Sequence, residues 1–317
     1  MATRPEPTPD EAARIADARE ALLAHKERTG ASWATLGDLI GRPGPTLSLF
    51  ATAKYEGQNL PIAEAAERFL DGLAAQAALG APKVPGFVMT PTAARMIAQL
   101  RFAQSGEIVA IACAPGTGKT STMRHYRSLA PNVWLATMTR SAARLQPMQI
   151  TALKAMGESN PKGSPLQLSA QVVAKMANSG GLLIVDEFPE LTDDAIEELR
   201  SWHDATGVGQ AFVGDYRTIA TIEGRKDSRD RAQIFRRVSM RMIRHTADAA
   251  DAAALLDAWG VTDAGSRKYA TSVALKPGAL GSMTKMLKLA HFAAEGAAVT
   301  EADLRAARAQ LTSTLDA

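Results

Sequence analysis

One short stretch, Cys113-Ala-Pro-Gly-Thr-Gly-Lys-Thr120, constrains the fold of this chain more than any other feature. It lies between an apolar run and a segment with the pattern of a helix start. Gly118, Lys119 and Thr120 match fixed positions of the phosphate-loop pattern, whereas Cys113 stands where that pattern has its first glycine. A buried strand, a glycine-rich turn and a helix in this order predict an anion-binding cradle on an α/β sheet.

Such a cradle is made mainly by backbone N–H groups at a helix N-terminus, so backbone shape matters more than the side chain of Cys113. Lys119 can reach the terminal phosphates of a nucleotide, and the Thr120 hydroxyl can bind Mg²⁺. The sequence therefore predicts a site for ATP and Mg²⁺. The residues that we expect to hold the cofactors here are Ala114, Pro115, Gly116, Thr117, Gly118, Lys119, Thr120 and Ser121.

Acidic side chains end two later apolar runs. Asp186 and Glu187 follow the run at 182–185, and Asp215 follows the run at 209–214. The carboxyl edge of parallel strands is where open α/β sheets bind ligands, so Asp186 there can hold Mg²⁺ through water. Glu187 can orient or deprotonate the water that attacks a γ-phosphate. Asp215 adds a carboxylate near the metal and the phosphate, which predicts slow hydrolysis.

The composition is that of a globular protein. The chain has 317 residues, of which 46% are hydrophobic and 22% are charged, and its net charge is +3. This length allows two or three domains, and no apolar run approaches the ~20 residues that a membrane-spanning helix needs. The proline-rich, acidic start lacks the pattern of a secretory signal, and the single cysteine excludes an internal disulfide. We therefore expect a cytoplasmic protein with no membrane partner.

Proline, glycine and apolar periodicity divide the chain into five segments. We expect a disordered arm at 1–10, a domain of short helices at 11–80, a linker at 81–92, an α/β core at 93–246 and an all-helical lid at 247–317. Strands are expected near 108–112, 132–137, 180–188, 209–215 and 238–245. The helical stretches between them imply a parallel sheet, and the mixed apolar and basic pattern of the last strand predicts an edge position.

The helical domain contains the pattern of a helix-turn-helix. Gly37 and Gly41 lie four residues apart among apolar residues, and the second helix is expected to begin near Gly44 or Pro45. Small residues here let the first helix and the turn pack closely. An alternative is a protein-interaction domain without DNA contact, because the outward face has few residues that read bases. The DNA-contact candidates in this domain are Arg42, Thr46, Ser48 and Lys54.

The core resembles AAA+ ATPases in the order of its phosphate loop and acid-terminated strands. The resemblance places Asp215 at the sensor 1 position, where Asn, Ser or Thr is more usual. It also places an arginine finger, which enters the nucleotide site of a neighbouring subunit, at Arg236 or Arg237, and we favour Arg237. No sensor 2 arginine is evident; Gly281 stands near its place, and Lys285, one turn later, is a substitute that contacts the nucleotide. The predicted catalytic residues are therefore Asp186, Glu187, Asp215, Arg236 and Arg237.

The whole chain resembles the Mu B family of phage transposition proteins. The resemblance rests on the domain order and on the tract LGDLIGRPGPTLSLFATAKYEGQN, with its KYEG after the second helix, whereas CAPGTGKT, LLIVDEF and FVGD mark only an AAA+ ATPase. It implies an ATP-dependent protein that binds double-stranded DNA with little sequence preference and forms helical filaments, hence a homo-oligomer. Such a protein captures target DNA in the bacterial host cell for a transposase, which stimulates ATP hydrolysis.

Candidate DNA contacts in the core follow from a resemblance to initiator-like AAA+ proteins, which use the segment after the second strand. In this chain the candidates are Arg140, Arg144 and Lys154. Basic side chains of this kind follow phosphates without reading sequence. A basic face of the lid, with Lys276, Lys285 and Lys288, is a candidate contact surface for the transposase.

Other functions share parts of this pattern. An ATP-dependent helicase loader or replication initiator would have the same core, finger and DNA-binding surface. A transcription regulator would use the helix-turn-helix to read an operator and the ATPase as a switch. An ATPase of secretion machinery would have the core but would also need a membrane or cell-wall-binding segment.

Overall fold

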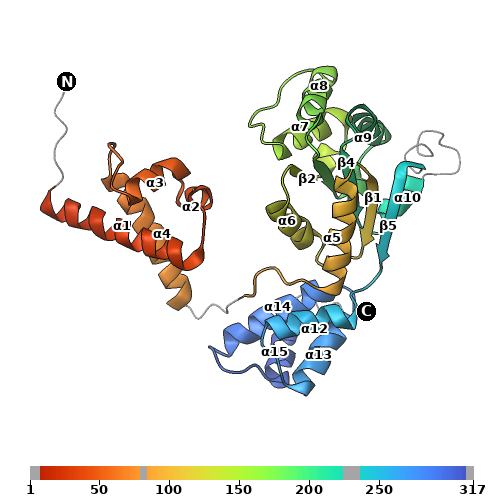
Figure 1. Cartoon of the computed structure of the whole chain (residues 1–317). Helices are drawn as coiled ribbons and strands as arrows, with labels where there is room; N and C mark the ends of the chain where they lie inside the picture. Colours follow the sequence, from red (N-terminus) through yellow and green to blue (C-terminus); the bar gives the residue numbers. More distant parts are fainter. Residues whose placement is uncertain (1–7, 79–83, 224–235, 312–317) are drawn as a thin grey trace, which may run out of the picture. The chain divides into compact units, whose positions relative to one another are not determined.

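The computed structural model describes residues 8–78, 84–223 and 236–311 (Figure 1). Contacts within the chain divide it into two units, Met1–Pro82 and Lys83–Ala317, and each is described by itself. In the described ranges, every helix is too short or too polar to span a lipid bilayer.

The first unit consists of helices around one small core. Apolar side chains from all its helices meet there, among them Leu22, Leu36, Leu47 and Phe50. The first and last helices are long, so the prediction of short helices throughout this domain is wrong. The helices are α1 (Pro9–Thr29), α2 (Trp33–Ile40), α3 (Gly44–Ala51) and α4 (Leu60–Ala78).

Helix α1 begins inside the segment that the sequence indicated as a disordered arm. Thr8 caps the helix with its hydroxyl, and the Glu11 side chain returns a hydrogen bond to the Thr8 backbone. This capping box, with Pro9 in the first turn, fixes the helix start. The expected arm therefore ends by Thr8, and residues 1–7 lie outside the described part of the chain.

The turn between α2 and α3 requires glycine, as the sequence indicated. A Cβ atom on Gly37 would lie 2.7 Å from the carbonyl oxygen of Arg42, and one on Gly44 would lie 2.7 Å from that of Trp33. Gly41 ends α2 with a left-handed φ of 73°. The two helices thus pack backbone against backbone, and α3 begins at the predicted Gly44.

The second unit is built on a five-stranded sheet with the order β2-β3-β4-β1-β5. Every strand pair is parallel, with register such as Ala112 opposite Gly214 and Val185 opposite Phe212. All five predicted strands are present, and β5 lies at an edge, so the predicted α/β fold with a parallel five-stranded sheet is confirmed. The strands are β1 (Ile108–Cys113), β2 (Val133–Thr137), β3 (Leu182–Asp186), β4 (Gly209–Gly214) and β5 (Val238–Arg244).

Helices cover both faces of the sheet. Alternate residues of each strand point to opposite sides, so one strand contributes side chains to the apolar clusters on both faces. Val109 and Ile111 pack in one cluster with α5 (Pro91–Gln104) and α6 (Lys119–Leu129). Ile108 and Ala110 pack in the other cluster, with the helices of the opposite face. These helices are α7 (Leu145–Ala155), α8 (Pro165–Met176), α9 (Asp193–Thr206) and α10 (Arg217–Glu223), with short 3₁₀ turns η1 (Arg140–Ala142) and η2 (Phe188–Glu190).

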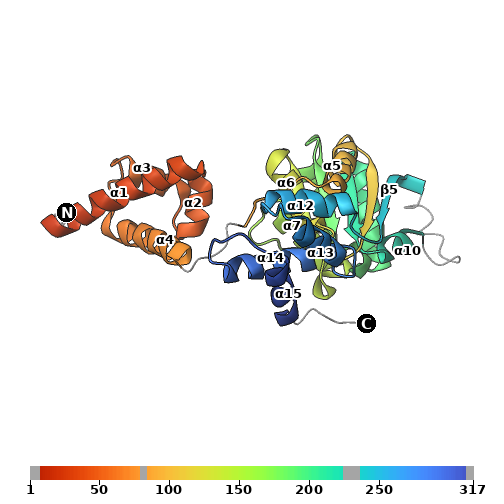
Figure 2. The same ribbon diagram turned by 90° about the horizontal axis from the view of Figure 1, so that it is seen from below.

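The C-terminal helices form a separate bundle with its own apolar core, which includes Leu256, Met283 and Leu287. Figure 1 shows them gathered below the sheet, and Figure 2, seen from below, shows them in front of the core. A buried link joins this lid to the core: the carboxylate of Asp251 accepts hydrogen bonds from the backbone N–H and the hydroxyl of Thr92 at the start of α5. The lid helices are α12 (Ala249–Ala258), α13 (Ala264–Ala274), α14 (Ala279–Ala293) and α15 (Glu301–Gln310).

Candidate nucleotide-binding site

The phosphate-loop segment forms a tight turn between β1 and α6. Gly116 and Gly118 have left-handed φ values of 81° and 91°, which glycine adopts without strain. Gly118 precedes the first residue of α6, so the first N–H groups of that helix face the loop. The Lys119 ammonium donates hydrogen bonds to the carbonyl oxygens of Cys113 at 2.7 Å and Ala114 at 3.2 Å. This contact keeps a positive charge inside the cradle.

Cys113 fits the loop because it still belongs to β1. Its side chain is fully buried in the apolar cluster beneath α5 and α6. Burial raises the pKa of the thiol to about 11, so the sulfur is neutral. Cys113 does not have a positive φ, so glycine is not required at this position, whereas Gly116 and Gly118 both have positive φ values.

The acids predicted from the apolar runs lie at the carboxyl edge of the sheet. Asp186 is buried, and it accepts a hydrogen bond of 3.0 Å from the Glu187 backbone N–H. Burial raises the pKa of Asp186, while Lys119 and the Thr120 hydroxyl act in the opposite direction. Glu187 is exposed and has a left-handed φ of 54°, a strained conformation that is frequent at functional sites. Its pKa is raised by partial burial and by the charge of Asp186.

Asp215, the unusual sensor 1 residue, is paired within its own loop. The Arg217 guanidinium lies 2.9 Å from one oxygen of Asp215, and the Arg217 backbone N–H donates to the other at 2.8 Å. The same guanidinium lies 3.3 Å from Glu190 of η2. The extra negative charge at this position is therefore largely balanced. Arg217 was not among the predicted site residues, although its place two residues after Asp215 was a usable signal.

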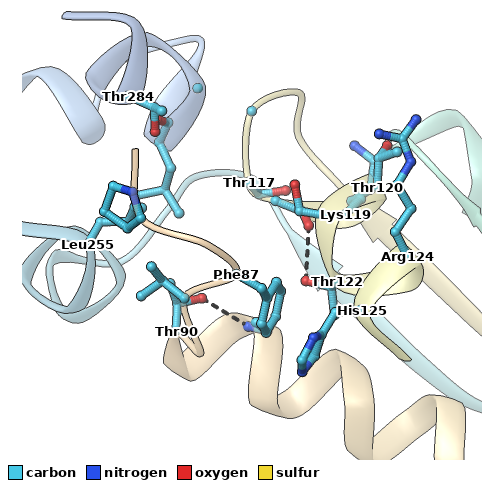
Figure 3. Close-up of a pocket in the computed structure, with 18 of the residues that line it drawn as sticks. Phe87, Thr90, Thr117, Lys119, Thr120, Thr122, Arg124, His125, Leu255 and Thr284 are labelled. Atoms are coloured by element: carbon cyan, nitrogen blue, oxygen red, sulfur yellow. Dashed lines mark hydrogen bonds between the residues drawn. The ribbon is translucent and has the colours of Figure 1, made fainter. Parts of the chain in front are cut away.

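A cavity of about 950 Å³ lies over the phosphate loop. Its walls include Glu187, Asp215 and the lid residues Leu280, Thr284 and Lys285. A pocket this large accommodates a nucleoside triphosphate. Figure 3 shows Leu255 and Thr284 of the lid on one side of the cavity and Lys119 and Thr120 on the other.

A further wall comes from residues 84–88, which the sequence had indicated only as linker. The Phe87 ring stacks on His125 of α6, with the ring centroids 3.8 Å apart and the planes inclined by 11° (Figure 3). Sequence reasoning missed both residues, because nothing in a segment rich in proline and glycine shows which helix it will contact. Arg124 and Trp259 also line the cavity and were not predicted.

The lid touches the phosphate loop directly. The Gly281 backbone N–H donates to the carbonyl oxygen of Gly116 at 3.0 Å. A Cβ atom on Gly116 would lie 2.0 Å from the carbonyl oxygen of Gly278. The close approach of the backbones explains why Gly281 stands where an arginine was expected. Lys285, the predicted substitute, lies at the cavity wall with an exposed side chain.

The two finger candidates lie away from this cavity. Arg236 and Arg237 are exposed just before β5, and neither is among the described residues that line the pocket. Arg237 forms an ion pair with Asp204 at the end of α9. A role for either arginine at a neighbouring subunit's site stays a prediction.

The DNA-contact candidates differ in how free their side chains are. The Arg140 side chain is 97% exposed, and its nearest carboxylate oxygen, on Glu190, is 3.8 Å away. Arg144, which immediately precedes α7, and Lys154 on α7 are exposed, and so is Lys54 in the first unit. Thr46 and Ser48 are half-buried, as is Arg42, whose guanidinium donates to the Pro61 carbonyl oxygen at 3.3 Å. The exposed face around α2 and α3 instead carries Leu39 and Leu49.

The residues at the loop fit Mg²⁺ held together with a nucleotide. Thr120 and Asp186 are hard oxygen donors, and the Thr120 hydroxyl acts to lower the pKa of the Asp186 carboxyl. The described residues contain no cluster of three or more His, Cys, Asp or Glu that could hold a metal on its own. Mg²⁺ is commonly bound by one or two protein oxygens, phosphates and water, so this donor set suits it.

Fold and site together define the AAA+ class of P-loop proteins, and the model of an AAA domain family matches residues 103–222. The family described as Mu B transposition protein, C terminal, matches residues 236–311. The chain is 30% identical over 283 residues to the ATP-dependent target DNA activator B of Escherichia phage Mu, which covers 89% of this chain and 90% of the relative. The chain therefore belongs to the Mu B family of transposition proteins.

Two further relatives and two solved structures are similar to this chain. The activator B of Escherichia phage D108 is also 30% identical over 283 residues. The Mu-like prophage FluMu DNA transposition protein B of Haemophilus influenzae is 27% identical over 83% of this chain and 93% of its own. Among solved structures, Drosophila ORC bound to DNA has a TM-score of 0.48 at 14% identity, covering 74% of this chain and 64% of its own. Domain III of the Thermotoga maritima replication initiation protein DnaA has a TM-score of 0.47 at 12% identity, covering 70% and 93%.

Proposed function

We propose that this chain binds and hydrolyses ATP, assembles on duplex DNA as an ATP-dependent filament, and delivers that target DNA to a transposase. The observation that carries the proposal is the cavity over the phosphate loop, which is lined by lid residues and by Glu187. Membership of the Mu B family supports the DNA-related part, because relatives are named ATP-dependent target DNA activators. Target DNA of a Mu-like element lies in a bacterial host cell, so the proposal puts the chain in the cytoplasm.

The chain's own groups divide the work of hydrolysis. Backbone N–H groups at the start of α6 and the Lys119 ammonium hold the phosphates. Thr120 and Asp186 would hold Mg²⁺, which when bound neutralises charge on the phosphate oxygens. Glu187, whose pKa is raised, orients the attacking water and accepts its proton. An arginine from a neighbouring copy, with Arg237 favoured, stabilises the charge that develops in the transition state.

An arginine finger supplied by a neighbouring copy makes assembly of the copies and hydrolysis of ATP depend on each other. ATP bound between two copies would stabilise their contact, and hydrolysis would weaken it. Turnover of the chain alone is expected to be slow, with the transposase as the partner that accelerates it. Contact with the transposase through the lid lysines Lys276, Lys285 and Lys288 remains part of the proposal.

DNA contact would come from exposed basic side chains on the core. Arg140, Arg144 and Lys154 follow β2 and can neutralise phosphates without reading bases. Arg42, Thr46, Ser48 and Lys54 remain the candidates of the helix-turn-helix unit. The apolar Leu39 and Leu49 at its surface favour a role in contacts within the filament over base reading.

The test is negative-stain electron microscopy of the protein on random-sequence duplex DNA, with and without a nonhydrolysable ATP analogue. Filaments that require the analogue, form on any sequence and are lost in Lys119→Ala support the proposal. Lys175, which is half-buried and pairs with Glu158 outside the described lining of the cavity, supplies the matched control Lys175→Ala. Discrete oligomers at one preferred sequence, or no DNA association, would contradict it.

A further inference from the structure

Two arginines share one carboxylate beside the nucleotide cavity. Arg217 approaches one oxygen of Glu190 at 3.3 Å, and Arg140 approaches the other at 3.8 Å. Arg217 also pairs with Asp215 at 2.9 Å. A continuous chain of ion pairs therefore runs from Arg140, which lies outside the cavity, to Asp215, which lines it.

The two ends of this chain of ion pairs differ in their exposure to solvent. The Arg140 side chain is 97% exposed, whereas those of Glu190 and Asp215 are 23% and 21% exposed. The 3.8 Å contact of Arg140 is also the longest of the three. A DNA phosphate offers a guanidinium a shorter, bidentate, charge-assisted contact. Arg140 is therefore the residue in this series of ion pairs that a phosphate can draw away from Glu190.

Glu190 is also tied to the catalytic acid through the backbone. Its N–H donates to the carbonyl oxygen of Glu187 at 3.1 Å, across the 3₁₀ turn η2 that begins after Glu187. The backbone of Glu190 is therefore fixed beside Glu187, and its carboxylate stays within reach of Arg217. Loss of Arg140 leaves this carboxylate with Arg217 as its remaining partner in the chain of ion pairs.

We propose that Arg217 is a positioning residue that couples phosphate occupancy at Arg140 to the placement of the Asp215 carboxylate, an inference that rests on the proposed function. With Arg140 on Glu190, Arg217 holds Asp215 in its loop. When a DNA phosphate takes Arg140, Glu190 draws the Arg217 guanidinium toward itself, and one oxygen of Asp215 loses that partner while the other keeps the Arg217 backbone N–H. The freed oxygen faces the cavity that Asp215 already lines and can accept a hydrogen bond from the attacking water. The slow hydrolysis predicted for this sensor 1 residue is then the rate without DNA, and hydrolysis is faster on DNA than off it.

The test measures steady-state ATP hydrolysis with and without saturating random-sequence duplex DNA. Each variant is also characterised by its KM for ATP and its DNA affinity. We expect DNA to raise kcat of the unchanged protein about fivefold or more, a usual size for coupling between sites. Arg140→Gln should raise the DNA-free kcat toward the DNA-bound value, with KM unchanged and the response to DNA lost.

Two further variants separate coupling from simple structural damage. Glu190→Gln should reduce the response to DNA to near unity while DNA is still bound. Arg217→Lys keeps one positive charge but cannot bridge two carboxylates, so it should hydrolyse ATP and yet respond weakly to DNA. Glu158→Gln, which breaks a 2.8 Å surface ion pair with Lys175, should respond like the unchanged protein.

Two contrary results are distinguishable. An unchanged protein that binds neither ATP nor DNA would overturn the proposed function and this inference with it. An unchanged protein that responds to DNA, with Arg140→Gln and Glu190→Gln responding equally at saturation, would overturn the coupling role of Arg217 alone.

Discussion

The backbone N–H of Gly281, in the lid, donates to the carbonyl oxygen of Gly116, in the phosphate loop, at 3.0 Å. This hydrogen bond joins segments that are far apart in the sequence and ties the position of the lid to the shape of the loop that would hold the phosphates. A change in one is therefore transmitted to the other. At this contact a Cβ atom on either glycine would come too close to the backbone of the other segment.

Adding one methyl group at this contact should weaken nucleotide binding. In Gly281→Ala the new Cβ would lie 3.3 Å from the Gly116 Cα, so the lid must shift by a few tenths of an ångström. Overpacking of this kind costs about 1–3 kcal/mol, and we expect the ATP affinity to fall about tenfold. Equilibrium titration with a fluorescent ATP analogue measures the effect. Gly72→Ala, on α4 where a Cβ meets open space, is the matched control and should bind like the unchanged protein.

The buried carboxylate of Asp251 should contribute strongly to the stability of the second unit. It accepts from the Thr92 N–H at 2.8 Å, the Thr92 hydroxyl at 2.7 Å and the Asp248 N–H at 3.0 Å. In Asp251→Asn one of the two backbone N–H groups must face an amide NH₂, which costs about 1–3 kcal/mol. Thr92→Val removes only the hydroxyl and should cost less.

Thermal unfolding followed by tryptophan fluorescence compares these two variants, with Trp259 as a reporter inside the lid. Asp251→Asn should melt at a lower temperature than Thr92→Val. An equal or higher melting temperature for Asp251→Asn would show that the carboxylate does not hold the lid in the way described.

Acid should destabilise the first unit through His25. The Arg28 guanidinium, which can only donate, lies 3.1 Å from Nδ1 of His25, so this nitrogen is the unprotonated acceptor of a neutral ring. Burial and the charge of Arg28 lower the pKa of His25 below 6.5. The unfolded chain therefore binds more protons near that pH, and stability is fully present above about pH 6.5 and falls as the pH decreases.

Hydrogen exchange of the α1 amides, corrected for intrinsic rates, measures this effect in the full chain. Protection should be lower at pH 5.5 than at pH 7.5. His25→Gln keeps an acceptor for Arg28 but cannot be protonated, so its protection should change less between the two pH values. Equal losses in both proteins would assign the acid sensitivity to other groups.

An arginine finger that acts between copies predicts complementation. Arg237→Ala should lower hydrolysis because it lacks the finger, and Glu187→Gln because it lacks the catalytic base. When the two variants are mixed, some interfaces between copies pair an intact finger with an intact base, so activity should return in part. Asp204→Asn breaks the ion pair of Arg237 within its own chain, together with the Asp204–Arg200 pair on α9, and should stay active. No recovery on mixing, together with an inactive Asp204→Asn, would make Arg237 a structural residue.

Local patterns were enough to predict much of this molecule. The strands of the second unit, the glycine-dependent turn of Gly37 and Gly44, and the phosphate loop each depend on residues close together in the sequence. The start of α1 was also marked locally, by Thr8 and Glu11, but the prolines before them favoured an interpretation as a disordered arm. In this case the proline in the first turn belongs to the helix.

The parts that were missed depend on contacts between distant segments. The stacking of Phe87 on His125 joins the linker to α6, and no periodicity shows that pairing. The contact of Gly281 with Gly116 replaces an expected arginine with a backbone hydrogen bond. The pairing of Asp215 with Arg217 changes the meaning of the unusual sensor 1 residue, because its charge is balanced in the folded chain.

The most direct test of the central claim is the affinity of the Lys119→Ala protein for ATP. The Lys119 ammonium lies within 3.2 Å of the carbonyl oxygens of Cys113 and Ala114 and is the cation that the cradle offers to the phosphates. Titration with a fluorescent ATP analogue should show saturable binding to the unchanged protein and to Lys175→Ala. Binding to Lys119→Ala should be at least about tenfold weaker, the loss of one charge-assisted contact to a phosphate. Equal affinity of the three proteins would place the nucleotide elsewhere and contradict the account.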